Sequence, residues 1–240
     1  MSIAKGKNAL LVASSYYGPF YPDGKNTGVH FSELLIPYNV FKKAGFNVQF
    51  VSENGSYKFD DHSIEESKLG DFERKVFNDK NDDFWTNLNN MKKASDIVGK
   101  DYQLLFVAGG HAAMFDLPKA TNLQAVAREV FTNGGVLSAV CHGPVLLANV
   151  KNPQSVEGKT VVYHKHVTAF NKAGEEKMGV MDELKKRGMK SLNEIFTEAG
   201  ATFIDPPNPN VNFTQIDGKI VTGVNPQSAK STAEAAVSAL

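Results

Sequence analysis

The sequence GGVLSAVCHGP, residues 134–144, gives the clearest indication of the fold. After two glycines, five residues (136–140) form a short apolar run that is typical of a strand in a parallel sheet covered on both faces. The run ends at Cys141, and a helix is expected to begin there and continue towards Val150. A buried strand that turns at once into a helix is typical of α/β proteins, so this segment predicts a strand near the middle of a parallel sheet.

The segments before it repeat this alternation. Apolar runs at 8–14, 47–51 and 103–107 predict strands, whereas apolar residues at helical spacing predict helices over 29–43 and 123–132. The order strand, helix, strand requires a crossover connection and therefore parallel pairing of right-handed topology. We expect a mostly parallel sheet with helices on both faces.

Two regions depart from this rhythm. Residues 55–99 are rich in Asp, Glu, Lys and Asn and predict short helices inserted on the surface as a solvated cap over the cleft. The last third predicts strands at 160–163 and 201–204, helices at 181–187 and 192–200, a hairpin over 213–222 with an Asp-Gly turn, and a final helix over 226–240. We expect one domain, residues 1–240, with a surface insertion at about 55–99.

Composition excludes several classes of protein. Of 240 residues, 42% are hydrophobic, and 26 Lys and Arg balance 26 Asp and Glu, so no net charge draws the chain to nucleic acid or to an anionic membrane. No apolar run is long enough to span a bilayer, and residues 1–7 lack the apolar core of a signal peptide. We expect an intracellular globular protein with no nucleic-acid or membrane partner.

Cys141 is the only cysteine, which excludes an intramolecular disulfide and a multi-cysteine zinc module. It is therefore either a buried apolar residue or a reactive thiol. Its place at the carboxyl end of a strand, where α/β sheets bind ligands, favours the thiol. A helix N-terminus there would favour the thiolate. Gly143 lies two residues after the cysteine, as in the nucleophile elbow of serine hydrolases, and Ala139 replaces the glycine two residues before it.

A second loop supports this site. Gly109, Gly110 and His111 follow the strand over 103–107, and glycines allow a backbone N–H to approach a substrate closely. The N–H groups of Gly110 and His142 are predicted to form an oxyanion hole. His111 either caps the loop or lines the pocket. No metal site is expected, because the other close pair, His164 and His166, would offer only two ligands. An aromatic group is expected to cover the sheet edge or a dimer contact rather than bind substrate: Tyr16, Tyr17, Phe20 and Tyr21.

Three stretches together resemble the ThiJ/PfpI superfamily: AGGH at 108–111, AVCHGP at 139–144 and TGVHFSE at 27–33. The insertion, Gly174-Glu175 and TGVNPQSA at 222–229 resemble its fungal branch, the heat shock protein 31-like, glutathione-independent glyoxalase III group. The resemblance implies a flavodoxin-like sandwich of the class I glutamine amidotransferase type. It also implies a cofactor-free lyase that acts on methylglyoxal and related 2-oxoaldehydes, converts methylglyoxal to D-lactate and works as a homodimer. We expect a cytoplasmic location by default, with entry into the nucleus because the protein is small.

The resemblance also assigns roles to residues. Cys141 would be the nucleophile and His142 its acid/base, while Glu33 would hydrogen-bond the sulfur and Glu175 would orient the histidine. A Glu33 carboxylate close to a thiolate would be repelled, so we expect a protonated Glu33 with a raised pKa. From the residues alone, Glu33 is otherwise a surface carboxylate, and the adjacent Glu176 competes with Glu175. Two departures from the family pattern are Ala112, where many relatives have Gly, and the unplaced His164-Lys165-His166.

Two other functions fit the same residues. Some relatives are described as holdase chaperones or protein deglycases, and unfolded proteins would then be partners while Cys141 would be incidental or an oxidation sensor. A Cys-His-acid set also fits a cysteine hydrolase, either a peptidase or an amidotransferase. The resemblance, rather than the chemistry of the elbow, places the glyoxalase function first.

Overall fold

A computed structural model describes residues 6–240; residues 1–5, part of the segment assessed above for a signal peptide, lie outside the described residues. Seven strands form the central sheet in the order β10-β11-β7-β6-β1-β4-β5. All neighbours pair in parallel except β10 and β11, which form the predicted hairpin. The strands are β1 (Asn8–Val12), β4 (Asn47–Ser52), β5 (Lys92–Lys93), β6 (Leu104–Val107), β7 (Val136–Val140), β10 (Thr214–Asp217) and β11 (Ile220–Gly223).

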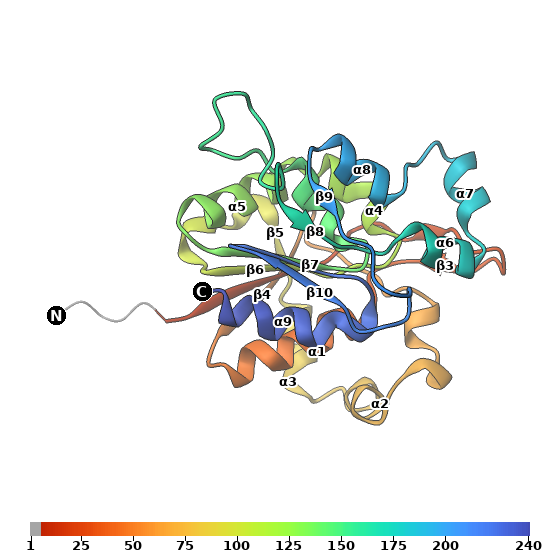
Figure 1. Ribbon diagram of the computed structural model, residues 1–240. Helices are drawn as coiled ribbons and strands as arrows, with labels where there is room; N and C mark the ends of the chain where they lie inside the picture. Colours follow the sequence, from red (N-terminus) through yellow and green to blue (C-terminus); the bar gives the residue numbers. More distant parts are fainter. Residues whose placement is uncertain (1–5) are drawn as a thin grey trace.

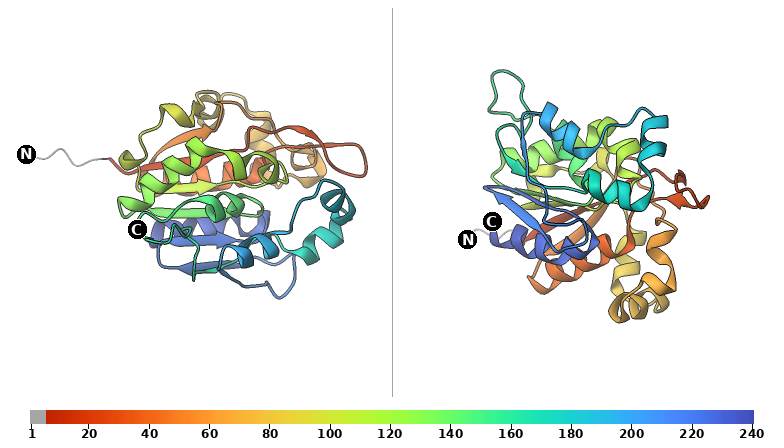
Figure 2. Two further views of the ribbon diagram at one scale, coloured as in Figure 1. Left: turned by 90° about the horizontal axis from the view of Figure 1, so that it is seen from above. Right: turned by 45° about the vertical axis from the view of Figure 1, so that its right-hand side comes forward.

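Helices cover both faces of this sheet, as Figures 1 and 2 show. Helices α1 (Phe31–Lys43) and α9 (Ala229–Ser238) pack side by side on one face, and α5 (Thr121–Thr132) covers the other. The apolar side chains of α5 recur every three or four residues and are buried against the sheet: Leu123, Val126, Ala127 and Val130. Strands β1, β6 and β7 are buried on both faces and form the centre of the core.

Shorter elements surround the carboxyl ends of the strands. The remaining helices are α2 (Asp71–Asn78), α3 (Asp83–Asn89), α4 (Ala113–Asp116), α6 (Lys172–Met178), α7 (Met181–Lys186) and α8 (Leu192–Glu198). Two small ladders pair β2 (Gly18–Pro19) with β3 (Asn26–Thr27), and β8 (His166–Val167) with β9 (Thr202–Phe203). Within the described residues there are also seven short 3-10 helices: His62–Ile64, Glu66–Lys68, Ala94–Asp96, Gly99–Asp101, Leu117–Lys119, Gly143–Asn149 and Pro226–Ser228.

The predicted α/β sandwich is confirmed, and three local predictions are wrong. Residues 161–164 are a turn rather than a strand, because Tyr163 and Lys165 donate backbone hydrogen bonds three residues back, and Thr160 forms only an isolated bridge with Lys151. The segment after Cys141 is a 3-10 helix that begins at Gly143 instead of an α-helix from Cys141. The final helix opens with a 3-10 turn, and α9 then ends at Ser238.

The insertion at 55–99 contains the expected short helices, but it is also part of the core. Its strand β5 forms one edge of the central sheet. Phe84, Trp85 and Leu88 of α3 are buried, and the Trp85 ring stacks on Phe31 of α1 with centroids 6.0 Å apart. Phe72 of α2, in contrast, is 46% exposed. The aromatic contacts thus tie the insertion to the helix that carries Glu33.

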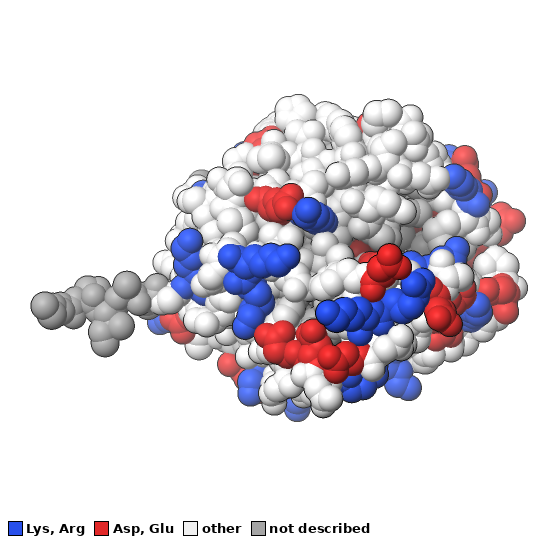
Figure 3. Space-filling view, turned by 90° about the horizontal axis from the view of Figure 1, so that it is seen from below, with Lys and Arg blue, Asp and Glu red and all other residues white. Residues whose placement is uncertain are grey.

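Charges of both signs are interspersed on the face that α1, α9 and the insertion helices form, with no field of one sign (Figure 3). This agrees with the balanced composition and offers no broad basic surface there for a polyanion. Within residues 6–240, no helix is both long and apolar enough to cross a membrane.

Candidate active site

A cavity of about 950 Å³ opens at the carboxyl ends of the central strands. Cys141 follows β7 and His111 follows β6, so adjacent parallel strands deliver both residues to the same edge of the sheet. Both line the cavity, together with Gly110 and His142. The cavity is therefore where the sequence predicted a site.

Cys141 forms a strained elbow. Its φ is 60°, in the left-handed region that non-glycine residues seldom occupy. Its N–H donates to Gly223 O at 3.0 Å, and its own carbonyl accepts from the Phe170 N–H at 2.9 Å. Gly109 permits the turn, because a Cβ there would lie 2.8 Å from the Cβ of Cys141. Backbone strain that the surrounding structure maintains is common at active sites. Here the strained elbow places Cys141 in the lining of the cavity.

Cys141, His142 and Glu175 form a buried chain. The sulfur lies 3.3 Å from His142 Nδ1, and His142 Nε2 lies 2.7 Å from Glu175 Oε1. Glu175 is on the first turn of α6, where the Asn171 side chain accepts from the Gly174 N–H and caps the helix. The neighbouring Glu176 is exposed. The structure thus brings together the predicted thiol, base and orienting carboxylate.

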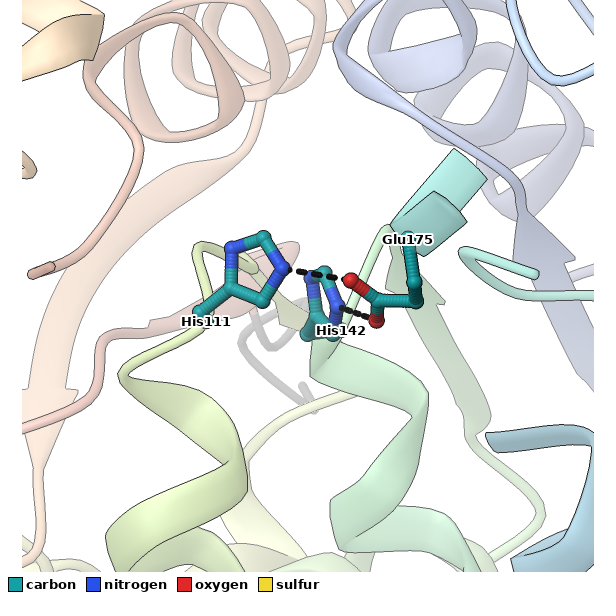
Figure 4. A group of neighbouring side chains, drawn as sticks. All are labelled: His111, His142 and Glu175. Atoms are coloured by element: carbon teal, nitrogen blue, oxygen red, sulfur yellow. Dashed lines mark hydrogen bonds and ion pairs between the residues drawn. The ribbon is translucent and has the colours of Figure 1, made fainter. Parts of the chain in front are cut away.

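His111 binds the same carboxylate from the other side. Its Nε2 lies 2.8 Å from Glu175 Oε2, so one carboxylate joins two imidazoles, as Figure 4 shows. Its Nδ1 lies 3.2 Å from the hydroxyl of Tyr21, which donates to Asp60 Oδ2 at 2.7 Å. Both Tyr21 and Asp60 line the cavity, so the expectation that Tyr21 only covers an edge or a dimer contact is wrong.

Glu33 is completely buried rather than on the surface. Its Oε2 accepts the Gly109 N–H at 2.6 Å, and its Oε1 has no hydrogen-bond partner of good geometry among the described residues. Burial raises the pKa of Glu33 to about 8, against the lowering effect of the Gly109 N–H and of Cys141. The predicted raised pKa is confirmed, and Glu33 holds a proton near neutral pH.

The pKa of the Cys141 thiol, however, is raised rather than lowered. Burial is the main cause and the charge of Glu33 the second, whereas the Gly110 N–H opposes them. The expectation of a thiolate is therefore wrong for the free protein. The reasons are that the segment after the elbow is a 3-10 helix with no α-helical N-terminus at the sulfur, and that the thiol is only 5% exposed.

His142 is a neutral base in this setting. Burial and then the charge of His111 lower its pKa to about 4, although Glu175 opposes them. Burial would raise the pKa of Glu175, but the facing imidazoles His111 and His142 together hold it well below its usual range. An ionised Glu175 accepts the Nε2 proton of His142 and leaves Nδ1 free to accept the proton of Cys141.

The backbone donors divide into two roles. The Gly110 N–H faces the Cys141 sulfur, as an oxyanion donor beside the nucleophile should. Gly110 has a φ of 97°, and a Cβ there would lie 2.1 Å from Gly28 O. The Gly109 N–H is instead bound to Glu33, so Gly109 holds that carboxyl and does not face a substrate.

The structure places the residues that depart from the family pattern. Ala112 is fully buried, and its N–H donates to Thr27 Oγ1 at 2.9 Å. His164 is exposed, and His166 binds Asp217 on β10. Neither of these two histidines lines the cavity.

Two residues of the network escaped prediction. Tyr21 and Asp60 lie in irregular segments with no periodic pattern, and a single Tyr or Asp there carries no signal of its own. Their proximity to His111 arises only when the β2–β3 hairpin and the segment after β4 fold over the cavity.

An elbow cysteine, a neighbouring histidine and two buried glutamates lie together at the edge of a flavodoxin-like sheet, which is the arrangement of an α/β enzyme. The chain belongs to the DJ-1/PfpI family, whose model matches residues 26–239. It is 61% identical over 234 residues to the glutathione-independent glyoxalase hsp3101 of Schizosaccharomyces pombe, which covers 98% of this chain and 96% of that protein. Identity to the glutathione-independent glyoxalase HSP31 of Saccharomyces cerevisiae is 38%, over 98% of each chain.

A solved structure agrees with these relatives. The crystal structure of glyoxalase III from Candida albicans matches with a TM-score of 0.94 at 42% identity, over 98% of this chain and 97% of that one. The resemblance to the superfamily and to its fungal branch is thereby confirmed, as is the flavodoxin-like fold.

Proposed function

We propose that this protein is a glutathione-independent glyoxalase of the lyase class that converts methylglyoxal and water to D-lactate. The observation that carries the proposal is the Cys141–His142 contact of 3.3 Å, with an ionised Glu175 behind the imidazole. The names of the relatives support the reaction type, and the cavity supports a small-molecule substrate.

The first step adds the thiol to the aldehyde. The Cys141 sulfur bonds to the aldehyde carbon while its proton passes to His142 Nδ1 and then to the aldehyde oxygen, giving a hemithioacetal. The developing negative charge on that oxygen would be stabilised by the Gly110 N–H. Because the free thiol keeps its proton, the base is needed at this step.

The second step moves a hydrogen between carbons. His142 removes the proton from the former aldehyde carbon, and the neighbouring oxygen takes up a proton to give an enediol. Protonation of the neighbouring carbon, with loss of the hydroxyl proton on the former aldehyde carbon, then gives the thioester of lactate. Protonated Glu33 beside the sulfur supports this transfer. Water then cleaves the thioester, which releases lactate and restores the thiol, so the sum is one methylglyoxal and one water per lactate.

The test follows D-lactate formed from methylglyoxal without glutathione, with and without a chelator. We expect the native chain to produce it, Cys141→Ala to abolish it, and Glu33→Gln to reduce it by about 10²-fold, the usual contribution of a proton-transfer group. Tyr17→Phe, which removes a hydroxyl outside the cavity, should leave the rate unchanged. Well-folded native protein that forms no lactate would overturn the proposal.

Three further features stay predictions. Suppression of client aggregation that persists in Cys141→Ala would reveal a separate holdase activity. A homodimer is expected, and sedimentation at micromolar concentration tests it. A cytoplasmic and nuclear location is expected, and imaging of the tagged chain tests that.

A further inference from the structure

The ring of His111 is fully engaged by the protein. It is 3% exposed, Nε2 faces Glu175 at 2.8 Å and Nδ1 faces the Tyr21 hydroxyl at 3.2 Å. A neutral imidazole has one N–H donor and one acceptor nitrogen, whereas an imidazolium has two donors. The protonation state of His111 therefore depends on whether each of its two partners donates or accepts a hydrogen bond.

The Tyr21 hydroxyl has only one proton, and it donates this proton in a hydrogen bond to Asp60. The hydroxyl donates to Asp60 Oδ2 at 2.7 Å, while the N–H groups of His62 and Ser63 donate to Oδ1 at 3.1 and 3.3 Å. Every one of these contacts treats the Asp60 carboxyl as an acceptor. Burial and the adjacent Asp60 raise the pKa of Tyr21 well above its ordinary value, so the phenol stays neutral. The phenol oxygen has two lone pairs, so it can accept a hydrogen bond from the Thr27 hydroxyl and a second one from His111 Nδ1.

Glu175 likewise requires a proton on the other ring nitrogen of His111, Nε2. Its two oxygens face the Nε2 atoms of His142 and His111, and as a carboxylate it accepts from both. His111 therefore needs a proton on each nitrogen. His142 needs only one, because its Nδ1 faces the Cys141 thiol. The Phe20 ring, 4.6 Å from the ring of His111, gives a cation an aromatic neighbour.

We propose that His111 is a positioning residue: an imidazolium fixed between Tyr21 and Glu175 that keeps His142 neutral, with its Nδ1 ready to accept the Cys141 proton. The catalytic meaning of this role rests on the proposed function, but the protonation state itself does not. The two rings lie 4.0 Å apart between centroids, so a second positive charge on His142 is strongly disfavoured.

The groups around His111 balance this charge. Glu175 on α6 faces it directly, Asp60 faces it through Tyr21, and His142 lies beside it after β7. With His142 neutral, the His111 cation and the Glu175 carboxylate cancel. When His142 takes the thiol proton, the new cation is paired with the nascent thiolate. Because His111 makes His142 a weak base, the imidazolium of His142 returns its proton readily to carbon.

The direct test is nitrogen-15 NMR of the histidines in the full native chain, with His111 assigned through His111→Gln. We expect N–H protons on both ring nitrogens of His111 at pH 7, and one on His142. A single protonated nitrogen on His111 in the folded native protein overturns the proposal. This readout needs no turnover, so failure of the proposed function, seen as absent lactate, is distinguishable from failure here.

A second test uses the pH dependence of Cys141 alkylation by iodoacetamide, and of lactate formation where it occurs. Removal of the cation should raise the pKa of His142, so His142 becomes protonated at a higher pH. We expect the acid limb to move up by about one pH unit in His111→Gln and by less in Tyr21→Phe. Tyr17→Phe, which breaks a Tyr–Asp contact outside the cavity, should not move it. An unmoved limb in both folded cavity variants contradicts the proposal.

Discussion

At the scale of single residues, the proposed nucleophile could be identified from the sequence, but its protonation state could not. The elbow motif around Cys141 is local, and so is its neighbour His142. The raised pKa of the thiol depends on burial and on Glu33, which reaches the sulfur from α1, on another part of the chain. Short-range patterns can therefore identify the reactive atoms, whereas their charge states depend on groups that only the fold brings together.

Glu33 should make the native protein less stable as the pH rises. Its pKa is about 8 in the folded protein and about 4.5 in the unfolded chain, so the folded state binds more protons between these values. The free energy of unfolding then falls as the pH rises from 4.5 to 8, by an amount of the order of a few kcal/mol at about 1.4 kcal/mol per pKa unit. Glu33→Gln removes this dependence and still accepts the Gly109 N–H.

Urea unfolding at pH 5 and pH 8.5 measures the effect. We expect native protein to lose stability relative to Glu33→Gln between the two pH values. Glu176→Gln is the matched control, because that carboxylate is exposed on α6, and its difference from native should not change with pH. Parallel pH profiles for native and Glu33→Gln would show that the carboxyl is not destabilised by burial.

At the scale of elements, segments with an apolar pattern were predictable, including the short helices α7 and α8, whereas helix α6 and the two-residue strands were not. The strands of the sheet centre and helices α1 and α5 match their apolar patterns. Helix α6 has seven residues, KAGEEKM, with too few apolar side chains to give a helical period, although it holds Glu175. Strands β2 and β3 have two residues each, so no alternation signals the hairpin that delivers Tyr21.

The cap of α6 should matter for catalysis as well as stability. Asn171 accepts from the Gly174 N–H at 3.0 Å and donates to Asp205 Oδ1 at 2.9 Å, which fixes the turn that carries Glu175. We expect Asn171→Ala to lower the free energy of unfolding by about 1 kcal/mol. It should also lower kcat about tenfold, because Glu175 loses its fixed position.

The matched control is Ser191→Ala, which removes the N-cap of α8 away from the cavity. A similar loss of stability with kcat unchanged is expected there, measured by thermal unfolding and by lactate formation. If both variants lowered kcat equally, the effect would be one of general stability and not of Glu175 placement.

At the scale of the whole molecule, the insertion at 55–99 is bound into the same core as the sheet. The sequence separates it by composition, yet the buried aromatic side chains of α3 pack against those of α1, and β5 extends the sheet. The sparse aromatic residues in a polar segment are what bind it. Because α1 also carries Glu33, the stability of the insertion and the geometry of the cavity should be linked.

Trp85 makes this testable, because it is the single tryptophan of the chain and lies in the insertion. Its fluorescence reports on the insertion, whereas far-ultraviolet circular dichroism reports on all helices and strands. For one cooperative domain, the two urea transitions should coincide.

Phe84→Ala, which empties a fully buried site between α3 and α1, should shift both transitions together, with a loss of about 3–5 kcal/mol in the free energy of unfolding. Phe72→Ala, on the exposed side of the insertion, should change stability by less than about 0.5 kcal/mol. A fluorescence transition at lower urea than the dichroism transition would mean that the insertion unfolds by itself, and the single-domain prediction for residues 1–240 would then be wrong.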